Sequence, residues 1–296
     1  MAKAVIDGLT LEYETFGDQS KPSILLIMGL GSQLIQWPEK LCQNLADHGH
    51  FVIRYDNRDV GLSTKMDETK SPNFTWAIIR HQLGLKPKLP YTLLDMAHDA
   101  IGLMDFLNIP QAHLVGVSMG GMIAQLMAIH FPQRALSLTS IMSTTGNPKL
   151  PRPKPEATAA LTNKASKDAS IEEIVLNNMQ GWKAIMSPGY PISDEVLKEK
   201  CHAAVKRSYY PAGTFRHLLA SICTPDRRKQ LQKLTIPALV IHGTDDPLIP
   251  IECGKDTANN IPQSEFHAIE GMAHDLPEEC LPKLCELIGT LTQRLA

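Results

Sequence analysis

The chain has 296 residues, of which 43% are hydrophobic, and this is enough to bury a substantial core. The formal net charge is −2, 20% of the residues are charged, and lysine and arginine form no dense block. These values exclude a strongly basic protein, so we expect no nucleic-acid partner and no insertion into a membrane.

Residues 1–22 are polar and mixed in charge, and they lack the apolar stretch and small-residue cleavage site of a signal peptide. The apolar run 24–30 is too short to cross a bilayer. The six cysteines are scattered and form no Cys-x-x-Cys pair. We therefore expect a cytoplasmic protein with buried, reduced thiols.

Short apolar segments recur along the chain and predict the strands of a sheet. Residues 4–6 and 10–16 form an expected hairpin around Asp7 and Gly8. The later segments are unbroken apolar runs, which are typical of strands buried on both faces, as in a parallel sheet. These runs are 23–28, 50–55, 112–117, 136–142, 238–242 and 266–269.

Amphipathic segments lie between the strands and predict helices. Residues 93–107 repeat apolar side chains at the spacing of one helical face. Residues 119–130 form a second helix that ends before Pro132, and 277–295 form a third. Because strands and helices alternate, the sequence predicts an α/β fold with a mostly parallel sheet flanked by helices.

The alternation stops between residues 146 and 234. Closely spaced prolines at 148–155 are typical of a linker. A capping box at Ser170 and the pair Thr224–Pro225 then mark expected helix starts. We expect this segment to be a helical cap over the carboxyl ends of the strands, where open α/β folds place their sites. The predicted division is a core domain of 1–145 and 235–296 and a cap of 146–234.

The run 116–120, Gly-Val-Ser-Met-Gly, follows an apolar strand and opens an apolar helix. It fits the Gly-x-Ser-x-Gly nucleophile elbow, in which Ser118 is the candidate nucleophile. We expect Ser118 to lie on a sharp, strained turn that points its hydroxyl outward. The glycines two residues before and after it leave room where the strand and helix backbones approach each other.

A serine hydroxyl needs a base to activate it and an acid to orient that base. His274 is the candidate base, because it follows the last predicted strand and precedes the last helix. The acid should follow strand 238–242, where Asp245 and Asp246 are both candidates, and the common spacing Gly-x-x-Asp favours Asp246. The earlier segment 140–147 contains no acidic residue.

The oxyanion formed during acyl transfer needs two N–H donors. The backbone of Met119, directly after the candidate nucleophile, is expected to supply one. Leu30, in the turn after the first parallel strand, is expected to supply the other. The alternative for residues 28–31 is an ordinary turn between a strand and a helix.

Together, these motifs resemble the α/β-hydrolase superfamily over nearly the whole chain. They are most similar to the subgroup that contains aclacinomycin methylesterase and many bacterial esterases. The resemblance implies ester hydrolysis by Ser118, Asp246 and His274, with no cofactor and with a helical cap. Many relatives carry histidine where this chain has Met28, which keeps the backbone donor but removes a bracing side chain. The segments that carry the resemblance are 28–32, 36–38, 55–63, 116–125 and 271–277.

Residues outside the three catalytic candidates are expected to support the site or to pack around it. The turn 56–63 is expected to brace the site. In the cap, Trp182, Tyr209 and Tyr210 either line a substrate pocket or pack in a helical core. His242 flanks the acid loop and is assigned no role.

Our hypothesis is hydrolysis of a small-molecule carboxylic ester through an acyl-enzyme. Perhydrolysis, lactone opening and C–C bond cleavage can use the same three residues, and these alternatives stay open. A ligand receptor that keeps a slow triad is an alternative of another class, and a homo-oligomer stays open too. No metal is expected, because His48 and His50 form the only His-x-His pair and no third ligand lies at suitable spacing.

Overall fold

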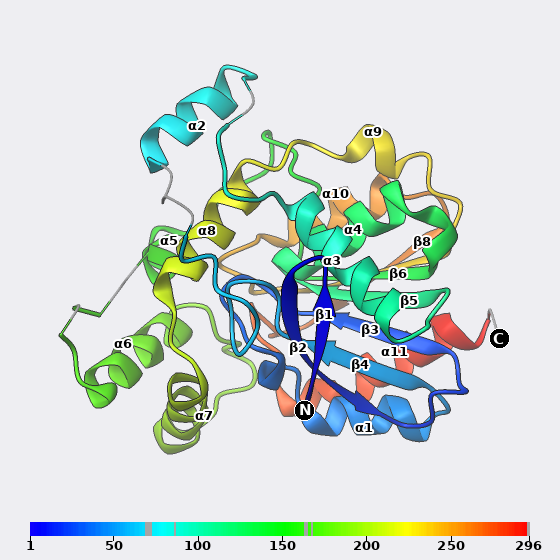
Figure 1. Ribbon diagram of the computed structural model, residues 1–296, viewed down its shortest axis with the longest axis horizontal. Coiled ribbons are helices and arrows are strands. Elements are labelled where there is room, and N and C mark those ends of the chain that lie inside the picture. The colour runs from blue at the N-terminus through cyan, green and yellow to red at the C-terminus, as the bar shows by residue number, and fades with distance from the viewer. Residues whose placement is uncertain (69–72, 86, 163–164, 167, 295–296) are drawn as a thin grey trace.

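The computed structural model describes residues 1–68, 73–85, 87–162, 165–166 and 168–294. The described residues form an eight-stranded sheet in the order β1-β2-β4-β3-β5-β6-β7-β8, with helices packed around it (Figure 1). The strands are β1 (Ala2–Ile6), β2 (Leu9–Phe16), β3 (Ser23–Ile27), β4 (Phe51–Tyr55), β5 (Ala112–Val117), β6 (Ala135–Ile141), β7 (Ala238–Gly243) and β8 (Ser264–Ile269). The helices are α1 (Glu39–Asp47), α2 (Phe74–Gln82), α3 (Leu93–Phe106), α4 (Met119–His130), α5 (Pro155–Thr162), α6 (Ile171–Lys183), α7 (Asp194–Arg207), α8 (Pro211–Ile222), α9 (Arg228–Leu231), α10 (Ile251–Asn259) and α11 (Leu281–Gln293).

The strand pairing confirms the predicted hairpin and the predicted parallel strands. β1 and β2 form an antiparallel hairpin, and β2 also runs antiparallel to β4. The other neighbouring strands of the sheet are parallel. Asp7 and Gly8, with φ of 46° and 82°, connect the hairpin in the left-handed conformation that a tight two-residue turn requires. The predicted α/β fold with a mostly parallel sheet is therefore confirmed.

The sheet separates two apolar layers, and β3 shows why its sequence is apolar throughout. Ile24 and Leu26 pack into one cluster with side chains of α1 and α11. Leu25 and Ile27 pack into the other cluster with side chains of α3 and α4. Because side chains alternate between the two faces of a strand, a strand covered on both faces needs an unbroken apolar run.

The predicted helices of the core are present, with small differences at their ends. α4 has the predicted bounds, and α3 ends one residue earlier than predicted. The tail helix begins later than predicted, because Glu278–Cys280 forms a 3-10 turn and α11 begins at Leu281. Residue 295, the predicted end of this helix, lies outside the described residues.

Helices α5 to α8 lie between β6 and β7 in the sequence. Figure 1 shows them gathered beside the sheet, beyond the carboxyl ends of β3 and β4. α6 and α7 pack on each other through an apolar cluster of their own, which includes Val175 and Leu197. The predicted capping box opens α6: Glu173 accepts a hydrogen bond from Ser170 N at 2.7 Å, and Ser170 Oγ accepts from Glu173 N at 3.3 Å.

The helix start predicted at Thr224–Pro225 is wrong. Thr224 Oγ1 donates a hydrogen bond back to Ala220 O at 2.7 Å, so its hydroxyl closes the end of α8 instead of capping a new helix. The next helix, α9, begins at Arg228, whose N–H donates to Asp226 Oδ1 at 3.0 Å. α9 then packs against α4 of the core.

The six cysteines are buried and unpaired, as the sequence predicts. Burial raises the pKa of the Cys42 thiol to about 12, so this thiol stays protonated and unreactive. Across the described residues, the helices are all too short or too polar to cross a membrane.

Candidate active site

Ser118 lies at the junction of β5 and α4, where the chain turns sharply. Its φ of 56° and ψ of −120° are rare for a residue with a side chain, and such a conformation costs about 1–3 kcal/mol. Its backbone is held by hydrogen bonds to β6 and to the segment just after it, among others: Ser118 N donates to Ile141 O at 2.9 Å, and Ser118 O accepts from Ser143 Oγ at 2.7 Å. The strained turn predicted from the sequence is therefore present, and Ser118 is partly exposed.

The two glycines of the elbow lie where backbones approach each other closely. A Cβ atom on Gly116 would overlap the carbonyl of Gly120, and a Cβ atom on Gly120 would overlap the carbonyl of Ile27 at the end of β3. These overlaps are with backbone atoms, which cannot rotate away. The predicted approach of strand and helix is confirmed at Gly116, whereas Gly120 leaves room for the neighbouring strand β3.

The structure brings the three predicted triad residues together. His274 Nε2 lies 2.9 Å from Ser118 Oγ, and His274 Nδ1 lies 2.7 Å from Asp246 Oδ2. The three side chains follow β5, β7 and β8, whose carboxyl ends meet at one edge of the sheet. In this arrangement the imidazole can donate to the carboxylate through Nδ1 and accept the serine proton at Nε2.

Asp246, and not Asp245, is the aspartate that contacts His274. Asp246 is buried, and its Oδ1 accepts hydrogen bonds from Leu248 N at 2.9 Å and Ile249 N at 2.8 Å. Asp245 is exposed. The two backbone donors occupy one carboxylate oxygen, which leaves Oδ2 directed at the imidazole.

His242 lies behind the acid, a position for which the sequence analysis assigned no role. Its Nε2 donates to Ile249 O at 2.7 Å and lies 3.6 Å from Asp246 Oδ2. Burial lowers the pKa of this imidazole, so the neutral form is favoured. The only sequence signal for this contact is its place at the end of β7, four residues before Asp246.

The turn after β3 lies directly against Ser118. A Cβ atom on Gly29 would be 3.2 Å from Ser118 Cβ, so the two backbones are close neighbours. Ser32 N donates to Gly29 O at 3.2 Å and closes the turn. Within the described residues, the amides of Leu30 and Met119 donate to no acceptor. Both predicted donors therefore have an N–H that is available to another group.

The turn 56–63 braces this arrangement, as predicted. Asn57 Nδ2 donates to Met28 O at 3.1 Å. Asp56 Oδ1 accepts from Leu34 N at 2.7 Å, at the other end of the same loop. Both ends of the loop after β3 are thus held by one turn.

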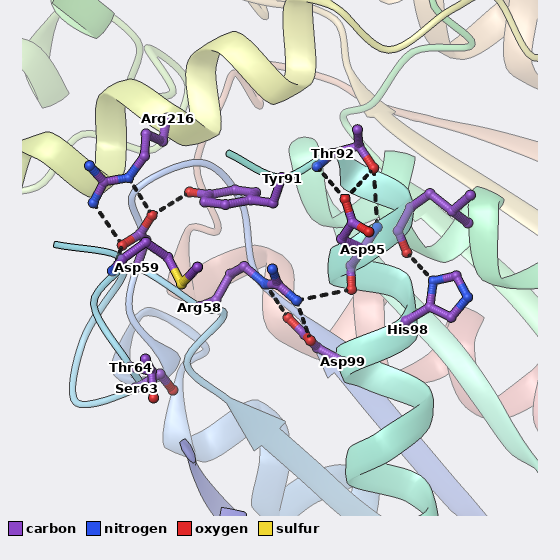
Figure 2. A network of polar contacts seen from close by, with 12 residues as sticks. Arg58, Asp59, Ser63, Thr64, Tyr91, Thr92, Asp95, His98, Asp99 and Arg216 are labelled. Atoms are coloured by element: carbon purple, nitrogen blue, oxygen red, sulfur yellow. Dashed lines mark hydrogen bonds and ion pairs between the residues drawn. The ribbon is translucent and has the colours of Figure 1, made fainter. Parts of the chain in front are cut away.

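Two ion pairs fix residues of this turn, and Figure 2 shows both. Arg58 Nε and Nη2 each lie 2.5 Å from an oxygen of Asp99 on α3. Asp59 accepts from Tyr91 OH at 2.7 Å and from Arg216 Nε at 2.7 Å. Because Arg216 lies on α8, the second pair joins the inserted helices to the core.

The loop that carries His274 is held by the segment after α6. His274 N donates to Ile185 O at 2.9 Å, and Ala273 N donates to Ser187 Oγ at 2.7 Å. Ser187 N in turn donates to Asp275 Oδ1 at 3.0 Å, across 88 positions of sequence. The sequence analysis missed these contacts, because no local pattern marks them.

The aromatic residues of the inserted segment have different surroundings. Trp182 packs beside the apolar cluster of α6 and α7, which is the helical-core role. Tyr210 OH accepts from Arg216 Nη2 at 2.8 Å and belongs to the polar network. Tyr209 is 36% exposed.

A family model described as alpha/beta hydrolase fold matches residues 22–182, which is more than half of the chain. The chain therefore belongs to the α/β-hydrolase family, and the resemblance inferred from the motifs is confirmed.

Two named relatives align with most of the chain. It is 30% identical to rhodomycin D methylesterase DauP of Streptomyces sp. (strain C5), over 92% of this chain and 91% of that protein. It is 28% identical to 3-oxoadipate enol-lactonase 2 of Acinetobacter baylyi (strain ATCC 33305 / BD413 / ADP1), over 88% and 85%. The crystal structure of an enol-lactonase from Burkholderia xenovorans LB400 shares the fold, with a TM-score of 0.72 at 21% identity over 99% of this chain and 100% of that one.

Proposed function

We propose that this protein hydrolyses carboxylic esters of small molecules through an acyl-enzyme formed on Ser118. The observation that carries the proposal is the hydrogen-bonded chain from Ser118 Oγ through His274 to Asp246, at 2.9 and 2.7 Å. The relatives point to the same chemistry, since one is named a methylesterase and another an enol-lactonase.

In the first half of the reaction, Ser118 Oγ attacks the ester carbonyl while its proton passes to His274 Nε2. Asp246 holds the imidazole through Nδ1 and stabilises the imidazolium that forms. The N–H groups of Leu30 and Met119 donate to the carbonyl oxygen as it becomes an oxyanion; one such donor contributes about 3 kcal/mol. The C–O bond to the alcohol then breaks, and His274 gives its proton to the departing oxygen.

In the second half, a water molecule replaces the alcohol. His274 takes a proton from this water as its oxygen attacks the acyl carbon. The bond between the acyl carbon and Ser118 Oγ breaks, the proton returns to Ser118, and the carboxylic acid leaves. The chemistry needs no cofactor at any step.

We further propose that residues 146–234 form a cap, of which α5 to α8 cover the site and select the substrate. The contacts of Ile185 and Ser187 with the His274 loop support this placement. We also propose a cytoplasmic location, which the unpaired cysteines favour, because free thiols persist in reducing compartments.

Lactone opening is the second candidate activity, because a lactone is a cyclic ester and one relative is an enol-lactonase. The same attack by Ser118 on the ring carbonyl would open the ring, and the alcohol would stay attached to the acyl group. The triad geometry suits both substrates equally.

The experiment is a turnover assay with methyl esters, short-chain nitrophenyl esters and unsaturated lactones of graded size. We expect many equivalents of acid per protein molecule from at least one ester series. Faster turnover of the lactones would assign the second activity instead. A burst of one equivalent followed by tight retention of the ligand would identify a receptor and contradict the proposal.

A further inference from the structure

Helix α8 of the inserted segment packs directly on the turn that carries Leu30. Gly31 has a φ of +66°, and a Cβ atom there would lie 2.8 Å from Thr214 Cγ2 on this helix. One turn further along α8, His217 Nδ1 accepts a hydrogen bond from Gly31 N at 3.2 Å. The contact joins residues 186 positions apart, so it belongs to the tertiary structure alone.

The surroundings of His217 fix its tautomer. Its Nε2 lies 2.7 Å from Arg58 O, and a carbonyl oxygen only accepts, so the ring proton is on Nε2. Nδ1 therefore has a lone pair for Gly31 N. The imidazole is fully buried, and this burial lowers its pKa to about 4, so it is neutral near pH 7.

These bonds determine the direction of the Leu30 amide. The Gly29–Leu30 peptide is planar, and Ser32 N holds its carbonyl oxygen, which is Gly29 O, at 3.2 Å. The next peptide, Leu30–Gly31, is held at its N–H by His217. The peptide planes on both sides of Leu30 are thus fixed. Only the Leu30–Gly31 plane depends on a side chain of the inserted helices.

We propose that His217 is a positioning residue for the oxyanion hole: by accepting from Gly31 N, it keeps the N–H of Leu30 directed at the oxyanion formed on Ser118. This role rests on the proposed ester hydrolysis. His217 is fully buried and its ring nitrogens bond Gly31 N and Arg58 O, so it acts through the backbone of the turn.

The test compares His217→Leu with His217→Gln. Leucine is of similar size but can make neither bond. Glutamine carries an acceptor oxygen and a donor NH₂ group on the same carbon, and the imidazole likewise carries Nδ1 and Nε2 on the same carbon. Glutamine can therefore accept from Gly31 N and donate to Arg58 O. When the Leu30 N–H no longer points at the oxyanion, kcat should fall and KM should stay unchanged, because this hydrogen bond forms in the transition state. We expect kcat to fall about 10- to 100-fold in His217→Leu and to recover to within about threefold of wild type in His217→Gln.

His113→Leu is the matched control for the loss of a buried histidine. His113 lies on β5, is also buried with a pKa lowered to about 4, and bonds Ser137 Oγ at 2.8 Å. We expect this variant to lose stability while its kcat stays at the wild-type value. As a second readout, the affinity for a trifluoromethyl ketone, which forms an oxyanion on the serine, should fall in parallel with kcat only in His217→Leu.

Three results would overturn this role. One is wild-type kcat in a folded His217→Leu variant. Another is an equal loss of kcat in His113→Leu, and the third is the absence of any recovery in His217→Gln. A wild-type protein that turns over no ester is a different result, since it overturns the proposed function itself and this role with it.

Discussion

Replacement of Ser118 by alanine is expected to lower kcat for ester hydrolysis by about 10⁶-fold. The remaining rate would come only from substrate binding and from the N–H donors of the oxyanion hole. Without the hydroxyl no acyl-enzyme forms, and His274 loses the serine proton that it accepts in the first half of the reaction. The fold should persist, because the backbone bonds of Ser118 to Ile141 and Ser143 do not involve its side chain. Initial rates with a short-chain nitrophenyl ester measure the effect, and the melting temperature checks the fold.

Ser137→Ala is the control for this change. It removes the hydroxyl of a buried serine near the start of β6, which bonds His113 and not the site. Its kcat should stay within about twofold of wild type. A Ser118→Ala variant that kept more than about a tenth of the wild-type kcat would show that another group is the nucleophile.

Replacement of Asp246 by asparagine is expected to lower kcat by about 10⁴-fold, through the wrong tautomer of His274. Leu248 N and Ile249 N both donate to Oδ1, so the asparagine oxygen should take that place. Its NH₂ group then faces His274 Nδ1 and donates to it. The ring proton moves to Nε2, which can no longer accept from Ser118.

Asp245→Asn makes the same chemical change at the exposed neighbour and serves as its control. We expect kcat within about twofold of wild type, because Asp245 does not contact the imidazole. The pair of variants also tests the choice of Asp246 over Asp245 that the spacing favours. Equal losses in both, or a loss in Asp245→Asn alone, would contradict the assignment of Asp246.

Local sequence patterns predicted the sheet and the elbow, because both have short-range causes. Unbroken apolar runs such as 112–117 are needed wherever a strand is covered on both faces. Gly116 is required because the first turn of α4 folds back against the end of β5. Gly120 is marked by the same motif, although its close approach is to Ile27 on β3. The order of strand, loop and helix around His274 followed from the same patterns.

Contacts between distant segments could not be predicted in this way. Ser187 holds the His274 loop and His217 holds the turn of Leu30, but neither residue stands in a pattern that names its partner. Thr224 shows a related limit, because a threonine hydroxyl before proline can cap a new helix or bond back to the previous one. In the structure the hydroxyl bonds back to Ala220 O, four residues earlier.

These contacts give the inserted segment a second role in our account. The part after α6 holds the loop of the base through Ile185 and Ser187, and α8 holds the oxyanion turn through His217. A change in this segment can therefore alter kcat as well as the choice of substrate. Variants made to change specificity should be checked for both parameters.

The most direct test of the central claim is covalent labelling of the wild-type protein with a fluorophosphonate, followed by peptide mass spectrometry. The reagent reacts with a serine only when a neighbouring base activates it. We predict one phosphonyl group per chain, on the peptide that contains Ser118, with esterase activity lost in proportion to labelling. Modification of a different residue, or full activity after Ser118 is completely labelled, would contradict the account.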